Sequence, residues 1–392
     1  MEFTLSEEQI AWKKKARQFA REEIRPISLE RDAVQDPKKT FDWEIIKKGS
    51  KLGFRTAAVP KEWGGPGMDM VSQAIVMSEL AWGDSAISKT FSQCWKWSHL
   101  IAVACNDDQK RRFLKPFLED DTYLLGLGGT EPEAGSDNRM PPDDPNTGWM
   151  TRAERRGEEW FLNGTKRYIA NGGVAKLYFV NTRTNPKVKL TEGTTLFLVP
   201  SDTPGFRIGK VYDKIGWRFY QNAELIFENA RVPHANVVGE VDKGVQSRRG
   251  VSSGFGDLEL AANALGVCQA AVDMSMEHAR SRIQGGRPII EHQGIQLLIT
   301  EMVMLTEALR SYVWRVAWDI ENGKPRDAKL HVLLMNFSCE VIQKVAHHNM
   351  EIHGGAGVMK DVGAEKLVRD AAIFTHLAAD TVQRVKAMRH IA

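Results

Sequence analysis

The sequence predicts an α+β protein in which helices open and close the chain and strands form its middle. Apolar residues recur with helical spacing through residues 1–121. Short β-type runs separated by Gly, Pro and Asp occupy 122–234, and long helical patterns return over 235–392. We therefore expect an N-terminal helical domain, a middle β-barrel or sandwich domain and a C-terminal four-helix bundle.

The first helix is predicted from its N-cap. Ser6 is followed by two glutamates, and a hydroxyl cap with acidic residues in the first turn favours a helix start. Ile10, Phe19 and Ile24 then form an apolar face, and Pro26 is expected to end the run. Further helices in this part are expected at 71–82, 84–98 and 106–118, with a Gly-Gly-Pro-Gly loop at 64–67.

The middle part shows strand patterns. Trp160–Lys166 is expected to be a hairpin, because Asn163–Gly164 is a preferred two-residue turn. Other strands are expected at 123–127, 177–180, 195–199 and 224–227.

The last part is predicted to hold four long helices. The patterns run over 258–281, 293–322 and 327–353, and a fourth begins near Gly363. Gly323–Lys324–Pro325 and Gly354–Gly355 are the expected stops.

Composition narrows the function. The net charge of +3, from 53 basic and 50 acidic residues, gives no electrostatic reason to expect nucleic acid or membrane binding. The four cysteines have no metal-ligand spacing, so we expect reduced thiols, no metal site and a cytoplasmic location. Neither a signal peptide nor a membrane-spanning apolar stretch is evident.

Thr130–Asp137, which reads TEPEAGSD, follows a predicted strand. Such a turn presents backbone N–H groups and small hydroxyls to a flat polar ligand, although alone it is no more than an ordinary turn. Six stretches together make it specific: LSEEQ at 5–9, PKEWGGPG at 60–67, TEPEAGSD at 130–137, NGTKRYIANGG at 163–173, GRPIIEHQGIQ at 286–296 and EIHGGAGVMKD at 351–361.

In order and spacing, these stretches resemble the acyl-CoA dehydrogenase family over nearly the whole chain. The resemblance implies a helical/β/helical fold, bound FAD, a homotetramer and oxidation of a CoA thioester between Cα and Cβ. It also implies electron-transfer flavoprotein as the electron acceptor.

The resemblance assigns cofactor residues in two groups. Leu127, Gly129 and Thr130 would line the polar edge of the flavin, where such groups stabilise charge on reduction. The rest of the first group would be Ser136, between flavin and CoA phosphates, and Tyr168, Ile169 and Ala170, with Tyr168 packed on the flavin. The second group would reach the FAD of a neighbouring subunit: Arg282, Gln293, Glu351, Gly354 and Gly355. Thr381 is a further predicted cofactor-binding residue.

One expected residue is missing. The reaction needs a base for the α-proton, and most of the family uses a Glu that here falls on Ala378. Asp380 lies two residues further on and is one candidate base. Asp257 is the other, because some members place the base near this helix start, at the position of Gly256. Asp257 could instead simply cap the helix.

The segment at 84–98 would line the end of the acyl chain. Ser92, Trp95, Lys96, Ser136 and Asp257 are the predicted substrate-binding residues. Trp95, with Phe91 and Trp97, suggests a flat or blocked pocket suited to a cyclic, aryl-substituted or otherwise atypical acyl group. Lys89 or Lys96 could pair with a carboxylate on the substrate, or could face solvent.

Three hypotheses therefore remain open. The first is an FAD-dependent acyl-CoA dehydrogenase with a relocated base. The second is a related flavoenzyme of other chemistry, such as monooxygenation, decarboxylation, elimination or reduction. The third is a base-lacking subunit that assembles with an active paralogue.

Overall fold

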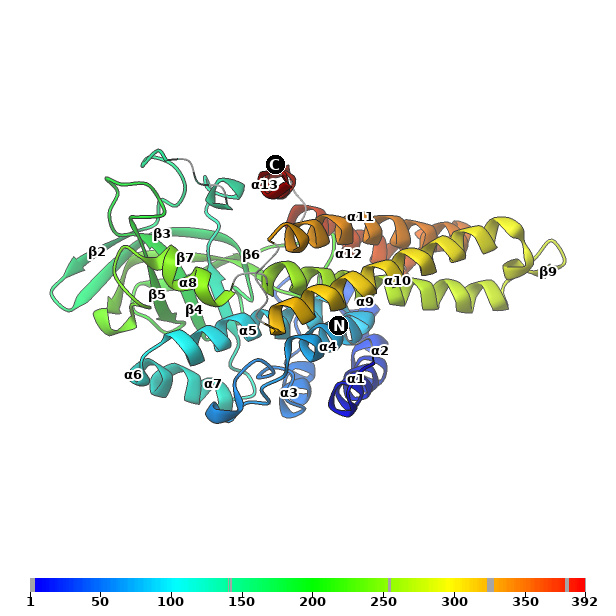
Figure 1. The fold of residues 1–392 in the computed structure, drawn as a ribbon, viewed down its shortest axis with the longest axis horizontal. Helices are drawn as coiled ribbons and strands as arrows, with labels where there is room; N and C mark the ends of the chain where they lie inside the picture. The colour runs from blue at the N-terminus through cyan, green and yellow to red at the C-terminus, as the bar shows by residue number, and fades with distance from the viewer. Residues whose placement is uncertain are drawn as a thin grey trace.

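The computed structural model describes residues 4–139, 141, 143–252, 255–322, 328–377 and 381–391. The chain forms a helical part, then one curled sheet, then a long helical bundle, so the expected α+β fold is confirmed (Figure 1). The sheet lies at one end of the molecule, and the bundle extends away from it to the β8–β9 hairpin at the other end (Figure 1).

The first helix begins where the sequence predicts. Ser6 Oγ accepts from the Gln9 backbone N–H at 3.2 Å, and the Gln9 side chain accepts from Ser6 N–H at 3.0 Å, which is a capping box. Pro26 does not end the helix, which corrects the prediction. The path continues from α1 (Glu7–Phe19) through a π turn (Ala20–Ile24) into α2 (Arg25–Ala33). Pro26 lies in the first turn of α2, where a missing N–H is tolerated.

Further helices complete the N-terminal part. They are α3 (Trp43–Lys51), α4 (Met70–Gly83), α5 (Ser85–Ala104), α6 (Asp107–Gln109) and α7 (Lys115–Glu119), with a π turn at Lys110–Leu114 between the last two. Asp84 caps α5, and Asn106 caps α6 as expected. Nearly the whole of α4 and α5 is buried, because both helices lie between the rest of the N-terminal helices and the C-terminal helix α9.

Seven strands form the sheet. They are β1 (Leu125–Gly128), β2 (Arg152–Arg156), β3 (Glu159–Ala170), β4 (Leu177–Arg183), β5 (Thr194–Pro200), β6 (Phe206–Val211) and β7 (Asn222–Pro233). The order is β1-β4-β2-β3-β7-β6, with β5 paired to β4. The strands β4 and β5 are buried almost throughout, so they form the centre of this part of the core.

The expected hairpin at Asn163–Gly164 is wrong. Both residues lie inside the continuous strand β3, at a bulge where the register with β7 shifts between Leu162 and Gly164. The hairpin turn lies earlier, at Gly157 between β2 and β3, with φ +64°. The Asn-Gly pair has the same backbone freedom at a bulge as in a turn, so the local sequence does not distinguish the two.

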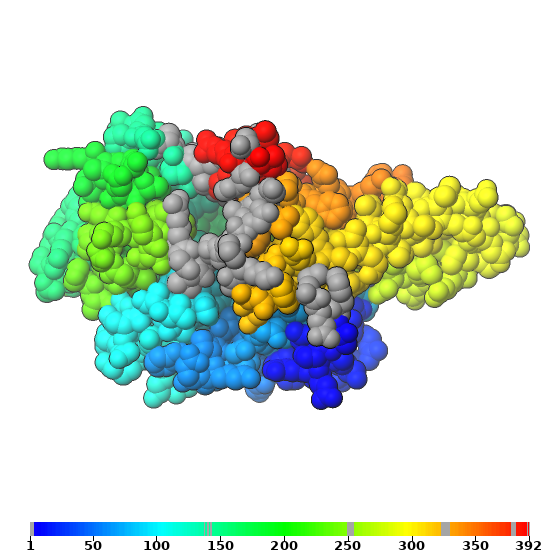
Figure 2. All heavy atoms as spheres, viewed as in Figure 1, coloured from blue at the N-terminus to red at the C-terminus, as the bar shows by residue number. Residues whose placement is uncertain are grey.

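The C-terminal part is a bundle of long helices. Their bounds are α8 (Gly244–Ser252), α9 (Phe255–Ser281), α10 (Gln293–Glu321), α11 (Ala328–His353), α12 (Ala364–Leu377) and α13 (Thr381–Ile391), with the hairpin β8 (Ile283–Gln284) and β9 (Arg287–Pro288) after α9. The four long helices predicted from the sequence are thus present as α9 to α12. The hairpin end of the bundle, yellow in Figure 2, projects beyond the rest of the molecule.

A buried charge cluster joins the three parts. Lys366 Nζ of α12 lies 2.6 Å from Asp370 Oδ2 and 3.0 Å from Asp84 Oδ2 at the start of α5. The Trp217 N–H, from the loop between β6 and β7, donates to Asp370 Oδ1 at 2.6 Å. All these groups are almost completely buried. One ammonium therefore connects the N-terminal helices, the sheet and the bundle.

Candidate active site

The two motifs assigned to the flavin meet at the edge of the sheet. The Arg167 N–H of β3 donates to Thr130 O at 2.8 Å, and Lys166 Nζ donates to Gly129 O at 3.4 Å. The turn that follows β1 is therefore fixed against the end of β3. Leu127 is half-buried beside it, and a Cβ built on Gly129 would meet the Leu127 side chain at 3.9 Å.

A buried ion pair holds this turn. Lys166 Nζ lies 2.6 Å from Glu131 Oε1, and the Glu131 carboxylate also accepts from the N–H groups of Met150 and Thr151. Burial lowers the pKa of Lys166, and the Glu131 carboxylate opposes that shift. The ion pair ties Glu131, which follows the turn directly, to β3, and Glu131 also binds the backbone at 150–151. Contacts among these three segments therefore hold the backbone of 129–130 in position.

Tyr168 has a strained backbone and an exposed ring. Its φ is +59°, a conformation that a bulky non-glycine residue rarely adopts. The ring is 57% exposed and packs on Tyr212 at a centroid distance of 4.7 Å. Asn222 Nδ2 donates to Tyr168 O at 2.8 Å and so helps to hold the backbone. Strain that holds an aromatic side chain outside the core is typical of a functional position.

The other residues of the first group differ in exposure. Ile169 has its side chain in the core, so only its backbone faces outward to a ligand. Ala170 is half-buried at the end of β3, and Ser136 is exposed in the turn that begins the 3₁₀ segment Ser136–Arg139.

The second group gathers at the projecting end of the bundle. The rings of His278 and His353 stack at 4.2 Å, which joins the end of α9 to the end of α11. Arg282 follows α9, Gln293 begins α10, and Gly354 follows α11. This end lies opposite the sheet (Figure 1). The two groups of one protomer therefore lie towards opposite ends of the molecule (Figure 1).

Within this group, the glycines are open. A Cβ built on Gly354 or Gly355 would have no neighbour within 4 Å among the described residues, and φ of Gly354 is +59°. Glu351 is half-exposed and lies near His348, with Oε2 3.1 Å from Nδ1. Gly285 and Gly286 form the two-residue turn of the β8–β9 hairpin with φ of +61° and +82°, a conformation that favours glycine.

The predicted acyl-chain helix faces α9 through a polar cluster. Lys89 Nζ pairs with the Glu259 carboxylate, and Ser92 Oγ donates to the same oxygen, Oε1, at 2.6 Å. Lys89, Ser92 and Glu259 are all buried. The hypothesis that Lys89 faces solvent is therefore wrong, and Ser92 is already bonded to Glu259.

Trp95 and Lys96 line a pocket of about 370 Å³ between α5, the loop before α4, the start of α9 and the end of α10. The Trp95 indole N–H donates to Phe54 O at 2.6 Å, which fixes the ring as a wall. Phe91 and Trp97 are buried like Trp95 but do not line the pocket, and Trp97 packs on Phe179 with the ring centroids 4.9 Å apart. They do not shape this pocket, so only Trp95 supports the expectation of a flat site.

The candidate bases are only partly described. Asp257 lies in the first turn of α9 and is half-buried. Ala378 and Asp380 lie outside the described residues, and Thr381 begins α13 with its side chain also outside them.

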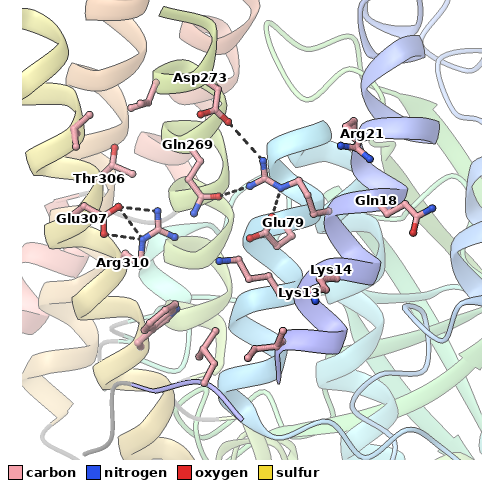
Figure 3. Close-up of a pocket in the computed structure, with 16 residues that line it drawn as sticks. Lys13, Lys14, Gln18, Arg21, Glu79, Gln269, Asp273, Thr306, Glu307 and Arg310 are labelled. Carbon is pink, nitrogen blue, oxygen red and sulfur yellow. Dashed lines mark hydrogen bonds and ion pairs between the residues drawn. The ribbon is translucent and has the colours of Figure 1, made fainter. Parts of the chain in front are cut away.

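A larger surface hollow lies elsewhere. It has about 970 Å³ between α1, α4, α9 and α10, and none of the residues predicted for the site lines it (Figure 3). Several of its charges are already paired: Arg17 with Glu79, and Arg310 with Glu307. It is a charged groove on the helical surface, separate from the flavin motifs.

Sequence analysis missed Glu131, Lys166 and Glu259. A signal existed for Glu259, which is the one charged residue in the apolar run Leu258–Ala262. Lys89, Ser92 and Lys96 follow the i, i+3, i+7 spacing of one helix face. A lone carboxylate in an apolar face requires a buried partner, and that face of α5 supplies it.

Comparisons with known proteins match the whole chain. Three domain models match in order: the acyl-CoA dehydrogenase N-terminal domain over 6–121, the middle domain over 126–230 and the C-terminal domain over 255–385. An acyl-CoA dehydrogenase of Bacillus subtilis is 32% identical over 370 residues, which cover 94% of this chain and 93% of that protein. The chain belongs to the acyl-CoA dehydrogenase family. It is therefore a flavin-dependent oxidoreductase that acts on a CH–CH bond.

Two further relatives are informative. A 3-(aryl)acrylate reductase of Clostridium sporogenes is 32% identical over 364 residues and covers 92% of both chains. The structure of butyryl-CoA dehydrogenase from Megasphaera elsdenii matches with a TM-score of 0.91 and 30% identity, covering 100% of both chains.

FAD is the cofactor of this family, and the residues present fit it. Tyr168 offers an exposed side chain beside the turn that follows β1, and Gly354 and Gly355 allow close approach of a diphosphate. Across the described ranges, no helix has the length and apolar character that a membrane span requires.

Proposed function

We propose that the protein oxidises an acyl-CoA thioester between Cα and Cβ through a relocated base, and that the acyl group is of an atypical kind. The observation that carries the proposal is the hydrogen bond between Arg167 N–H and Thr130 O, because it brings the two flavin motifs to one edge of the sheet. FAD held at this edge would supply the hydride acceptor that the oxidation requires.

The chain's own residues would position the cofactor. Leu127, Gly129 and Thr130 would present backbone and hydroxyl groups to the polar edge of the flavin, held by the Glu131–Lys166 pair. The other proposed contacts of this protomer are Ser136, Tyr168, Ile169 and Ala170. A second copy would supply the contacts of Arg282, Gln293, Glu351, Gly354 and Gly355 to the diphosphate and adenosine side, which makes a homo-oligomer necessary for a complete site. Thr381 is a further proposed cofactor contact.

Asp257 and Asp380 are the proposed bases. The α-proton of a thioester is only mildly acidic, so its acceptor must be close and shielded from water. Asp257 meets part of this requirement because it is half-buried in the first turn of α9, where its charge acts on Lys96.

The substrate is proposed to be cyclic, aryl-substituted or otherwise atypical. The fixed indole of Trp95, which lines the pocket, supports a flat group. Electrons would pass to electron-transfer flavoprotein.

A second candidate is the reverse reaction, reduction of an α,β-unsaturated acyl-CoA. It is favoured by the 3-(aryl)acrylate reductase relative. Here the same acid–base group would donate a proton to Cα.

The test is an anaerobic titration of the purified, flavin-loaded protein with straight-chain, alicyclic and aryl-substituted acyl-CoAs. Loss of visible flavin absorbance with one class supports oxidation. Asp257→Asn and Asp380→Asn should each be compared with Asp202→Asn, a change at an exposed turn. The true base variant should reduce flavin at least about 100-fold more slowly, given the usual contribution of acid–base catalysis. No bleaching by any thioester would overturn the oxidation proposal.

The proposed reduction requires a separate experiment. The flavin is first reduced chemically, and re-oxidation by enoyl-CoA or arylacrylyl-CoA is then followed. Re-oxidation without any forward bleaching would favour the reductase. Failure of both arms, with flavin bound, would favour a base-lacking subunit.

A further inference from the structure

The pocket lined by Trp95 and Lys96 contains a cation that contacts none of the described carboxylates, although Glu259 and Asp257 act on it from a longer distance. Within the described part of the chain, Lys96 Nζ has no hydrogen-bond or ion-pair partner, and it lies over the Trp97 ring, 4.9 Å from the centroid. Lys89, which lies on the same helix face, already forms an ion pair with Glu259. A partly buried charge normally has a partner, so an unpaired one indicates a missing anion.

The rest of the pocket suits a small, partly apolar ligand. Its volume is about 370 Å³, and Trp95, Met68 and Phe255 provide apolar walls. Glu321 also lines it, but its carboxylate accepts from Met70 N–H at 2.7 Å and so is engaged at the helix start of α4. His99 faces Ala58 O at 3.4 Å. Lys96 is therefore the group that remains available to an anion.

We propose that this pocket binds the far end of an acyl group that carries a terminal carboxylate, and that Lys96 selects it. The inference rests on the proposed function, because α5 is where the acyl end is expected. It narrows the substrate from an atypical acyl group to a dicarboxylic monothioester.

The electrostatics agree with this role. Burial, and the nearby Arg248 guanidinium, lower the pKa of Lys96 to about 8. A substrate carboxylate bound beside Lys96 would compensate the cost of burying the ammonium, and burial would strengthen the ion pair between the two groups. The charged or titratable groups that face Lys96 are Arg248 of α8, Asp257 and Glu259 of α9, Glu321 of α10, and Lys89 and His99 of its own helix.

The direct test compares matched thioesters by calorimetry, which needs no turnover. Glutaryl-CoA and valeryl-CoA have the same chain length and differ by the terminal carboxylate. We expect wild-type protein to bind glutaryl-CoA roughly 10- to 100-fold more tightly, as for a charge-assisted hydrogen bond. Equal affinities, or a preference for valeryl-CoA, would overturn the proposal.

Variants assign the preference to Lys96. Lys96→Met keeps the length of the side chain and should abolish the preference while leaving valeryl-CoA binding within about twofold, whereas Lys96→Arg, which retains the charge, should keep most of it. Lys47→Met, an exposed lysine on α3, is the control. A preference that survives Lys96→Met would place the selecting group elsewhere.

The pH profile gives a second readout. The Lys96 ammonium is present below about pH 8 in the free protein, so glutaryl-CoA affinity should fall above that pH. Valeryl-CoA affinity should show no such fall. If no thioester reduces the flavin and glutaryl-CoA is still selected through Lys96, then the proposed oxidation fails and the anion site stands. If thioesters reduce the flavin and glutaryl-CoA is not selected, then the oxidation stands and the anion site fails.

Discussion

Lys166 Nζ and Glu131 Oε1 are 2.6 Å apart with side chains 0% and 4% exposed, whereas the pair of the same length between Lys176 and Asp120 is 44% and 37% exposed. Lys166→Met would leave the Glu131 carboxylate buried without its cation. We expect a loss of about 3–5 kcal/mol in the free energy of unfolding, measured by urea denaturation. Lys176→Met is the matched control and should cost less than about 1 kcal/mol. Equal losses would show that burial does not set the strength of these pairs.

Asp120 should contribute a pH-dependent stability. Burial opposes its ionisation, but hydrogen bonds from Lys176 and Thr122 outweigh this and lower the pKa of Asp120 to about 2 from the ordinary 3.8. Because the folded pKa lies below the unfolded one, the contribution is complete above pH 3.8 and is lost as pH falls towards about 2.

Asp120→Asn tests this window. The variant should be less stable than wild type at pH 6, by under about 1 kcal/mol because solvent screens an exposed pair. The difference should shrink between pH 4 and pH 2.5 in urea titrations, if the protein remains folded at the acid end without denaturant. A difference that is constant with pH would contradict the assignment.

The bulge at Gly164 should not tolerate a side chain. A Cβ there would lie 2.8 Å from Thr151 Cα, which is backbone and cannot move aside, and φ is +141°. Gly157, with φ +64° and no described atom within 4 Å, is the control. We expect Gly157→Ala to cost about 1–2 kcal/mol. Gly164→Ala should cost roughly twice as much, because the clash adds about 1–3 kcal/mol. The thermal midpoints should rank in the same order; the reverse order would show that the strand moves freely.

Tyr168 should affect stability and cofactor binding in opposite directions. Tyr168→Gly removes the strain of a positive φ, so the FAD-free protein should be as stable as wild type or about 1 kcal/mol more stable. The same change removes the exposed ring, and FAD affinity should fall at least about 10-fold, as for loss of an aromatic contact. Asn229→Gly, with φ of +52° on β7, is the control and should leave FAD affinity unchanged. Urea denaturation measures the stability, and fluorescence titration with FAD measures the affinity. An unchanged FAD affinity in Tyr168→Gly would show that Tyr168 is not part of the cofactor site.

Local signals predicted the elements well, because caps and periodicity depend on neighbours in the chain. Ser6 and Asn106 cap helices as expected, and α9 to α12 follow their apolar patterns. Pairings between distant segments were not predictable in the same way. Lys89 and Glu259 are 170 positions apart, and the sequence around either residue does not identify the other as its partner. The prediction for Pro26 failed for a different reason. A π turn precedes α2 and places Pro26 in the first turn of that helix, and the apolar periodicity of the sequence does not indicate a π turn.

The buried cluster around Lys366 affects whether parts of the chain can fold as separate fragments. Its single positive charge balances carboxylates from α5 and α12, and Asp370 also receives the Trp217 N–H from the sheet. A fragment that ends before α12 would keep Asp84 without its cation, and a fragment that begins after α5 would keep Lys366 with one carboxylate fewer. We therefore expect that none of the three parts can be expressed as an independent unit, and that the intact chain melts in one calorimetric transition.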